Sequence, residues 1–166
     1  VYGDRIAAMA AAARLPHSVA QSAWTVPPDL GHLEQAIGEA DVEAVAIVHH
    51  ETTTGLRNPV LEVGRLARAR GKLLLVDAVS GLAGDPLDVE AAGADLVVGT
   101  ANKCIQGLPG ISFVLVRESI VERLAGYPRR SLYLSLPLHY EAQMRGSTPF
   151  TPAVQVAYAL DEALAE

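Results

Sequence analysis

Short apolar runs alternate with amphipathic segments along this chain. Four aliphatic runs predict β-strands, over residues 44–48, 73–76, 95–99 and 111–116. Unbroken apolar runs of this length, such as 44–48, are typical of strands buried on both faces of a parallel sheet. Residues 17–22 are expected to form one further short strand.

Helical periodicity and capping signals occupy the stretches between these runs. Helices are expected over residues 2–14, from an Asp29 N-cap to about residue 40, from an Asn58 N-cap with Pro59 in the first turn to Gly71, and over 118–124 and 152–164. In the last helix four residues are placed for packing: Val154, Ala157, Tyr158 and Leu160.

The remaining stretches predict loops. Residues 23–28 contain two prolines, residues 49–58 are polar, and residues 127–138 indicate a long excursion. Strands that alternate with helices indicate an α/β fold, a mainly parallel sheet flanked by helices within one domain over residues 1–166.

Composition narrows the class of protein. The chain has 166 residues, half of them hydrophobic, and a net charge of −6. This charge argues against nucleic-acid binding, and no apolar run approaches the roughly 20 residues that span a bilayer. No signal peptide is visible, and the missing initial Met suggests a fragment or a processed chain. The single cysteine, Cys104, excludes an internal disulfide and fits a reducing, cytoplasmic location.

The candidate chemistry follows three of the predicted strands. Asp77 ends the strand at 73–76, Lys103 comes just after the strand at 95–99, and a His49–Thr54 segment follows the strand at 44–48. In open parallel sheets, ligands bind beyond the carboxyl ends of the strands. Asp77 and Lys103 therefore suit pyridoxal phosphate: the lysine forms a Schiff base with the cofactor aldehyde, and the acid keeps the pyridine nitrogen protonated.

Simpler interpretations exist for the same residues. Lys103 could be an ordinary surface lysine, and Asp77 could only cap its own turn. His49 and His50 invite a metal interpretation, but neighbouring residues on an extended segment point to opposite faces, so no metal is expected. Cys104 is expected to be a small buried residue.

Four motifs, in this order, resemble the class V aminotransferases of the fold type I pyridoxal phosphate scaffold. They are His50-Glu51-Thr52-Thr53-Thr54-Gly55 with Asn58-Pro59, Val76-Asp77-Ala78 with Ser80, Ala101-Asn102-Lys103-Cys104 with Gly107, Pro109 and Gly110, and Phe150-Thr151-Pro152. Each motif alone is weak, but their combination is specific and covers most of the chain.

The resemblance implies a role for each candidate site residue. Lys103 matches the Schiff-base lysine and catalytic base, and Asp77 the partner of the pyridinium nitrogen. Five further residues match cofactor contacts: Thr53 near the phenolic oxygen, Val79 against the ring face, Ser80, Asn102 at the phosphate, and Thr151 at the phosphate of a neighbouring subunit's cofactor. The last role implies a homodimer with shared sites. Trp24 is expected to pack under the loop at Pro27 and Pro28.

The resemblance is greatest to the branch of the family that transfers the amino group of 2-aminoethylphosphonate to pyruvate. It also implies that an N-terminal phosphate-binding segment and a C-terminal small domain are missing, so the chain is expected to be a partial cofactor-binding large domain. Two other functions stay open: another class V transaminase of the alanine– or serine–glyoxylate type, and a non-catalytic remnant that serves as a dimerisation or scaffold module.

Overall fold

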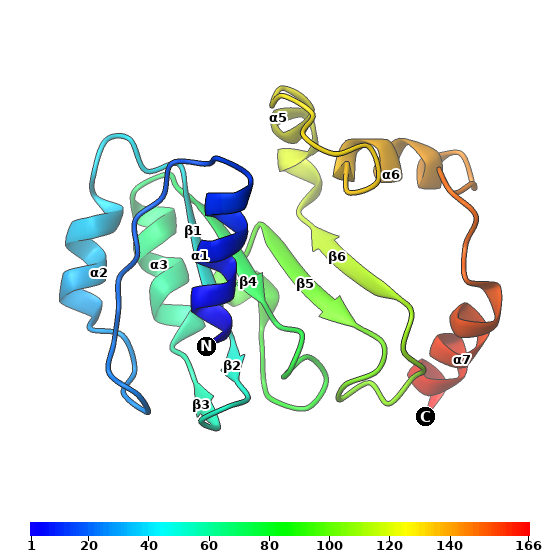
Figure 1. Ribbon diagram of the computed structural model, residues 1–166, viewed down its shortest axis with the longest axis horizontal. Coiled ribbons are helices and arrows are strands. Elements are labelled where there is room, and N and C mark those ends of the chain that lie inside the picture. Colours follow the sequence, from blue (N-terminus) through cyan, green and yellow to red (C-terminus); the bar gives the residue numbers. More distant parts are fainter.

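A four-stranded sheet organises the computed structural model, which describes residues 1–166. Its strand order is β1 (Ala44–Val48), β4 (Leu73–Asp77), β5 (Leu96–Thr100) and β6 (Ser112–Val116). The first three are parallel, and β6 pairs antiparallel with β5. A short hairpin of β2 (His50–Glu51) and β3 (Leu56–Arg57) follows β1 (Figure 1). The expected α/β fold with a mainly parallel sheet is confirmed.

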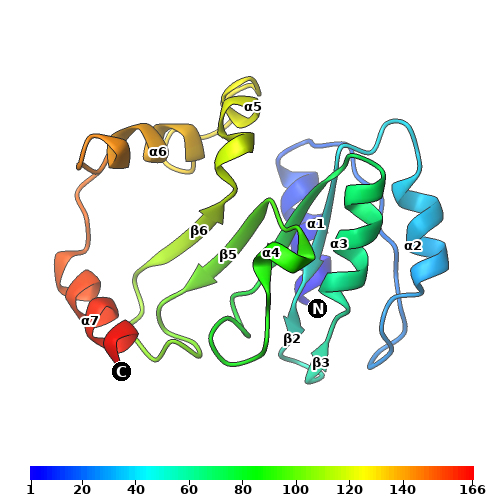
Figure 2. The ribbon, with the colours of Figure 1, turned by 180° about the vertical axis from the view of Figure 1, so that it is seen from behind.

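Helices cover both faces of this sheet. On one side lie α3 (Val60–Ala69) and α4 (Val89–Ala92), with α2 (Leu30–Ile37) next to α3, and on the other lies α1 (Tyr2–Ala12) (Figures 1 and 2). The main core forms between α3, α4, β4 and β5 from aliphatic side chains, among them Val63, Leu74, Val76 and Val97. The strand β1 is only partly buried, because it lies at an edge, so the expected burial of both its faces was wrong.

A glycine sets the distance between α3 and α4. A Cβ on Gly64 would lie 1.8 Å from the carbonyl oxygen of Ala92, so any side chain there would push the helices apart.

The last third of the chain extends beyond β6. It comprises a 3₁₀ turn (Glu118–Ile120), α5 (Val121–Ala125), α6 (Leu136–Met144) and α7 (Val154–Ala165). Helices α5 and α6 lie near the end of β6, whereas α7 lies near the loop between β5 and β6, where β6 begins (Figure 1). No helix of the structure has the length and apolar character needed to cross a membrane.

Several local expectations were wrong. Residues 17–22 pair with no strand and stay irregular. The Asn58 side chain donates to the carbonyl of Val48 at 2.8 Å instead of capping α3, which begins at Val60. No residue of α7 is buried, and Tyr158 is 73% exposed. Trp24 is 70% exposed and does not pack under the proline loop.

Two helices were not expected. The short helix α4 has both standard end signals, since Asp88 accepts from the amide of Ala91 at 2.8 Å and Gly93 ends it with a φ of 67°. Helix α6 begins inside the stretch assigned to an excursion, where Pro137 occupies the first turn, a position that tolerates proline.

Candidate active site

The carboxyl ends of β1, β4 and β5 meet at one edge of the sheet, as the sequence predicts. In the strand register Val48 lies beside Asp77, and Asp77 lies beside Val98. The amide of His49 donates to the carbonyl of Asp77 at 2.8 Å, and the amide of Ala78 donates to the carbonyl of Val98 at 3.0 Å. The three loops that carry the predicted site residues therefore begin side by side.

Asp77 ends β4 with a half-buried side chain. Its Oδ1 accepts a hydrogen bond from the amide of Val79 at 3.0 Å, so it does shape its own turn. Its second carboxylate oxygen accepts no hydrogen bond from the protein, and Asp77 forms no ion pair. One oxygen thus holds the loop, and the other is free to meet a cationic group at the edge of the sheet.

Lys103 lies in an exposed turn after β5. The turn is closed by two backbone hydrogen bonds of 2.8 Å, from Gln106 to the carbonyl of Lys103 and from Gly107 to that of Ala101. Gln106 has a φ of 65°, an unfavourable conformation for a residue with a side chain. The Lys103 ammonium donates no hydrogen bond and forms no ion pair, so its amine is available to a ligand.

The loop after β4 lies between the loops that follow β1 and β5. On one side the Ser80 carbonyl accepts from Cys104 Sγ at 3.3 Å. On the other, the Ser80 hydroxyl accepts from Thr52 Oγ1 at 2.5 Å. A Cβ on Gly84 would lie 2.5 Å from Cys104 Sγ, so this glycine allows the close approach. Cys104 is exposed, and the expectation that it is buried was wrong.

Thr53 lies in the turn of the β2–β3 hairpin. Its hydroxyl donates to Glu51 Oε1 at 2.9 Å, and Glu51 Oε2 in turn accepts from the amide of Tyr2 at 2.8 Å. Burial alone would raise the pKa of the Glu51 carboxyl. Hydrogen bonds from Tyr2 and Thr53 outweigh this effect, so the pKa lies below its usual value. Glu51 therefore stays ionised and orients the Thr53 hydroxyl.

The remaining predicted contacts are brought together only in part. Val79 is half-buried in the loop after β4, and Asn102 is exposed beside Lys103. Asn102 Oδ1 lies 2.9 Å from Thr100 Oγ1, which leaves its amide nitrogen free to donate. Thr151 is exposed in the segment between α6 and α7 and hydrogen-bonds to none of the other candidates.

His49 and His50 have environments that the sequence did not reveal. The side chain of His49 is 2% exposed, its Nδ1 has no hydrogen-bond partner, and burial lowers its pKa. A Cβ on Gly81 would lie 2.8 Å from that nitrogen. His50 instead points to Asp85, and its Nδ1 hydrogen-bonds to Asp85 Oδ2. The two rings therefore have different surroundings. Asp85 was not among the predicted site residues.

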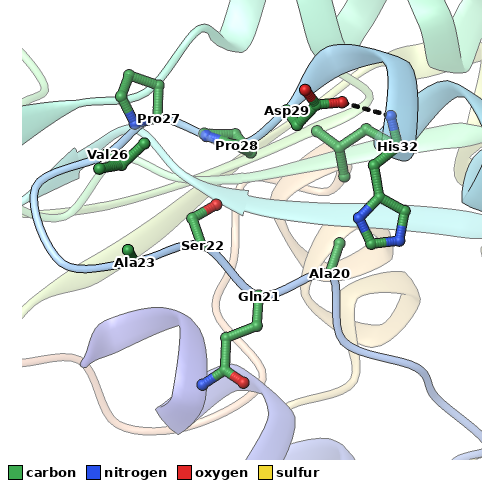
Figure 3. A pocket seen from close by; sticks show the side chains of 10 residues that line it. Ala20, Gln21, Ser22, Ala23, Val26, Pro27, Pro28, Asp29 and His32 are labelled. Carbon is green, nitrogen blue, oxygen red and sulfur yellow. Dashed lines mark hydrogen bonds between the residues drawn. The ribbon is translucent and has the colours of Figure 1, made fainter.

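A separate shallow hollow lies among the loop that precedes α2 and the start of that helix (Figure 3). Small side chains line most of it, and its one carboxylate, Asp29, already caps α2 through a 2.7 Å hydrogen bond from the amide of His32. It contains none of the predicted site residues.

Comparison with known proteins defines the family. The Aminotransferase class-V family model matches residues 7–165, so the chain belongs to the class V aminotransferases. The chain is 40% identical over 171 residues to a 2-aminoethylphosphonate–pyruvate transaminase of Syntrophobacter fumaroxidans, covering 99% of the chain and 45% of that relative. A 2-aminoethylphosphonate–pyruvate transaminase of Vibrio vulnificus is 38% identical, with 99% and 46% covered. The chain spans about half the length of these curated relatives.

Solved structures give the same result for the fold. An alanine–glyoxylate aminotransferase from Nostoc sp. superposes with a TM-score of 0.92 at 30% identity, covering 99% of this chain and 45% of that one. A pyridoxamine–pyruvate aminotransferase from Mesorhizobium loti gives 0.88 at 31% identity, with 99% and 43% covered. Both confirm the expected fold type I architecture.

The cofactor of this family is pyridoxal 5′-phosphate, as expected from the sequence. The chemistry at the sheet edge fits it. Asp77 offers a free carboxylate oxygen for a ring nitrogen, and Lys103 offers an unpaired amine for an aldehyde. Asn102 and Ser80 supply polar groups at the same edge.

Proposed function

We propose that the intact protein transfers the amino group of 2-aminoethylphosphonate to pyruvate, giving phosphonoacetaldehyde and alanine. The observation that carries the choice of substrates is the 40% identity, over 99% of the chain, to a relative that bears the name of this reaction. The free carboxylate of Asp77 and the free amine of Lys103 at one sheet edge support aminotransfer as the chemistry.

In this proposal the cofactor, when bound, supplies an aldehyde that captures the amino donor and a ring that takes up electrons from its C–H bond. Asp77 would pair with the ring nitrogen and keep it protonated. Lys103 would hold the cofactor through its amine, and the same amine, once released, would move the proton between substrate and cofactor.

The other proposed contacts keep the cofactor in place. Val79 would lie against the ring, and Thr53, whose hydroxyl donates to Glu51 in the structure, would contact the phenolic oxygen. Polar groups of Ser80 and Asn102 complete the contacts within the chain, and Thr151 serves the site of a neighbouring subunit. We therefore propose a homodimer in the cytoplasm, with residues 1–166 forming part of its cofactor-binding large domain.

A second transaminase activity has a specific observation in its favour. The structure of the Nostoc alanine–glyoxylate aminotransferase superposes on 99% of this chain with a TM-score of 0.92. The same Asp77 and Lys103 would serve that reaction, because the proton transfer is common to both. A non-catalytic remnant is the third possibility, and the free Lys103 amine argues against it.

An amino-donor comparison tests the proposal. Intact protein with added cofactor is given 2-aminoethylphosphonate, alanine or serine as donor, with pyruvate or glyoxylate as acceptor, and the new amino acid is quantified. We expect 2-aminoethylphosphonate with pyruvate to give the highest kcat/KM. A preference for alanine with glyoxylate would support the second activity, and no product from any pair would support the remnant.

A further inference from the structure

Only two hydrogen bonds between side chains join the β2–β3 hairpin to the loop after β4. One runs between His50 Nδ1 and Asp85 Oδ2, and the other from Thr52 Oγ1 to Ser80 Oγ at 2.5 Å. The hairpin carries Thr53, and the loop begins directly at Asp77. These two bonds add to the backbone hydrogen bond from His49 to Asp77 in setting the relative placement of the two candidate cofactor contacts.

The His50–Asp85 pair is partly shielded from water. The side chains of His50 and Asp85 are 28% and 31% exposed. The nearby groups that carry or can carry charge are His49 and Arg57, which act on Asp85 with His50. A charge-assisted hydrogen bond in such surroundings is stronger than a fully solvated one, because less water competes for it.

The loop after β4, which carries Asp85, packs closely against both the hairpin and the Lys103 turn. A Cβ on Gly81 would lie 3.1 Å from His50 Cβ, and a Cβ on Gly84 would lie 2.5 Å from Cys104 Sγ. Ala83, between these glycines, has a φ of 72°. A shift of Asp85 would therefore reach both the hairpin and the turn that carries Lys103.

We propose that His50 and Asp85 are positioning residues: their hydrogen bond fixes the Thr53 hairpin against the Asp77 loop and thereby sets the affinity for pyridoxal phosphate. This inference rests on the proposed function. Neither residue is assigned a contact with the cofactor. Their effect passes through Thr53 and Asp77, and it differs from a contribution to folding alone because it changes binding more than unfolding.

The test measures cofactor affinity and stability in the same variants of the intact protein. His50→Ala and Asp85→Ala are each expected to raise the dissociation constant of pyridoxal 5′-phosphate about tenfold. The double variant is expected to bind no more weakly than either single one, because both remove the same interaction. His50→Asn, which can place an N–H near the position of Nδ1, is expected to recover most of the affinity.

Arg70→Ala is the matched control. It removes an ion pair of the same kind, Arg70 to Glu34 at 3.0 Å, between α3 and α2 and away from the sheet edge. Its thermal midpoint without cofactor is expected to resemble that of the His50 and Asp85 variants, with an unchanged dissociation constant.

Three results would overturn the proposal: unchanged affinity in both single variants, fully additive losses in the double variant, or an equal loss in Arg70→Ala. If an alanine variant fails to fold, Asp85→Asn replaces it, and unchanged affinity there has the same meaning. Failure of the proposed function looks different, because wild-type protein and Lys103→Ala would then bind the cofactor equally poorly.

Discussion

Each edge of the sheet presents an aspartate and a lysine for comparison, and the surroundings of the two pairs are opposite. At the amino edge, the 8%-exposed Asp95 accepts from the amide of Leu74 at 2.8 Å and pairs with Arg117 at 3.3 Å. Lys72 at this edge donates to the carbonyl of Glu39 at 3.1 Å. At the carboxyl edge, Asp77 keeps one oxygen free and Lys103 has no partner.

This difference separates the parts of the molecule that stabilise the fold from the part proposed to bind the cofactor. Satisfied polar groups at the amino edge join β4, β5 and the segment after β6. The carboxyl edge instead holds a buried His49 nitrogen without a partner, and positive φ angles at Ala83 and Gln106. Such unsatisfied and strained groups cost stability and concentrate at functional sites.

The largest contrast is expected between the two lysines. In the intact protein, Lys103→Ala should lower kcat by about four orders of magnitude, because the group proposed to move the proton is lost. Its free energy of unfolding should change by less than about 0.5 kcal/mol, since Lys103 has no partner to lose. Lys72→Ala, the control at the other edge, should leave kcat within about twofold. Equal losses of kcat in both variants would contradict the assignment.

The carboxylate of Asp77 should have the next largest effect on turnover. Asp77→Asn keeps an oxygen that can accept from the amide of Val79 but removes the charge proposed to face the ring nitrogen. Turnover should fall by about two to three orders of magnitude, while cofactor still binds. Single-turnover kinetics of the proton transfer measures this directly, and near-normal rates would refute the role.

Asp95 should behave as the reverse of Asp77. Asp95→Ala leaves the amide of Leu74 without its acceptor and removes the pair with Arg117. We expect a loss of about 2–3 kcal/mol in the free energy of unfolding, measured by urea denaturation. The cofactor dissociation constant should change by less than about twofold once folded protein is compared. If Asp95→Ala weakened cofactor binding well beyond twofold but left the free energy of unfolding near its wild-type value, the distinction between the two edges would be wrong.

The smallest expected effect concerns pH. The hydrogen bond from His50 lowers the pKa of Asp85 below its usual value. The stabilisation is therefore present above the unfolded-state pKa of about 3.9 and is lost as the pH falls through the lower folded-state value. Asp85→Asn should lower the thermal midpoint at pH 7, and this difference should shrink below about pH 4. Asp41→Asn, at a side chain with no hydrogen bond or ion pair, should show no difference at either pH.

The sheet was predictable from the sequence because its strands are unbroken apolar runs. All four were placed to within one residue, and with them the edge at which Asp77 and the Lys103 turn begin. The helix α7 was found but its packing was not, because periodicity alone does not say whether a neighbour covers the apolar face. The strand predicted over residues 17–22 was wrong for the same reason. A strand requires a partner strand, and the local sequence does not show whether one is present.

The candidate site was predictable where one residue acts alone and not where two distant ones meet. Asp77 and Lys103 stand out by their positions after strands. The hydrogen bond between His50 and Asp85 joins residues that lie 35 positions apart in the sequence. It depends on how two loops pack, so no local sequence pattern predicts it. The exposure of Cys104 likewise follows from its place in the turn after β5, which no local pattern shows.

The central claim is that the Lys103 amine at the carboxyl edge carries the cofactor, and residues 1–166 contain only one other lysine, Lys72, as an internal control. Intact protein is incubated with pyridoxal 5′-phosphate, reduced with borohydride and digested, and the modified peptide is identified by mass spectrometry. The account predicts stoichiometric label on Lys103 and none on Lys72. Label on Lys72, or on neither of these two lysines, would contradict it.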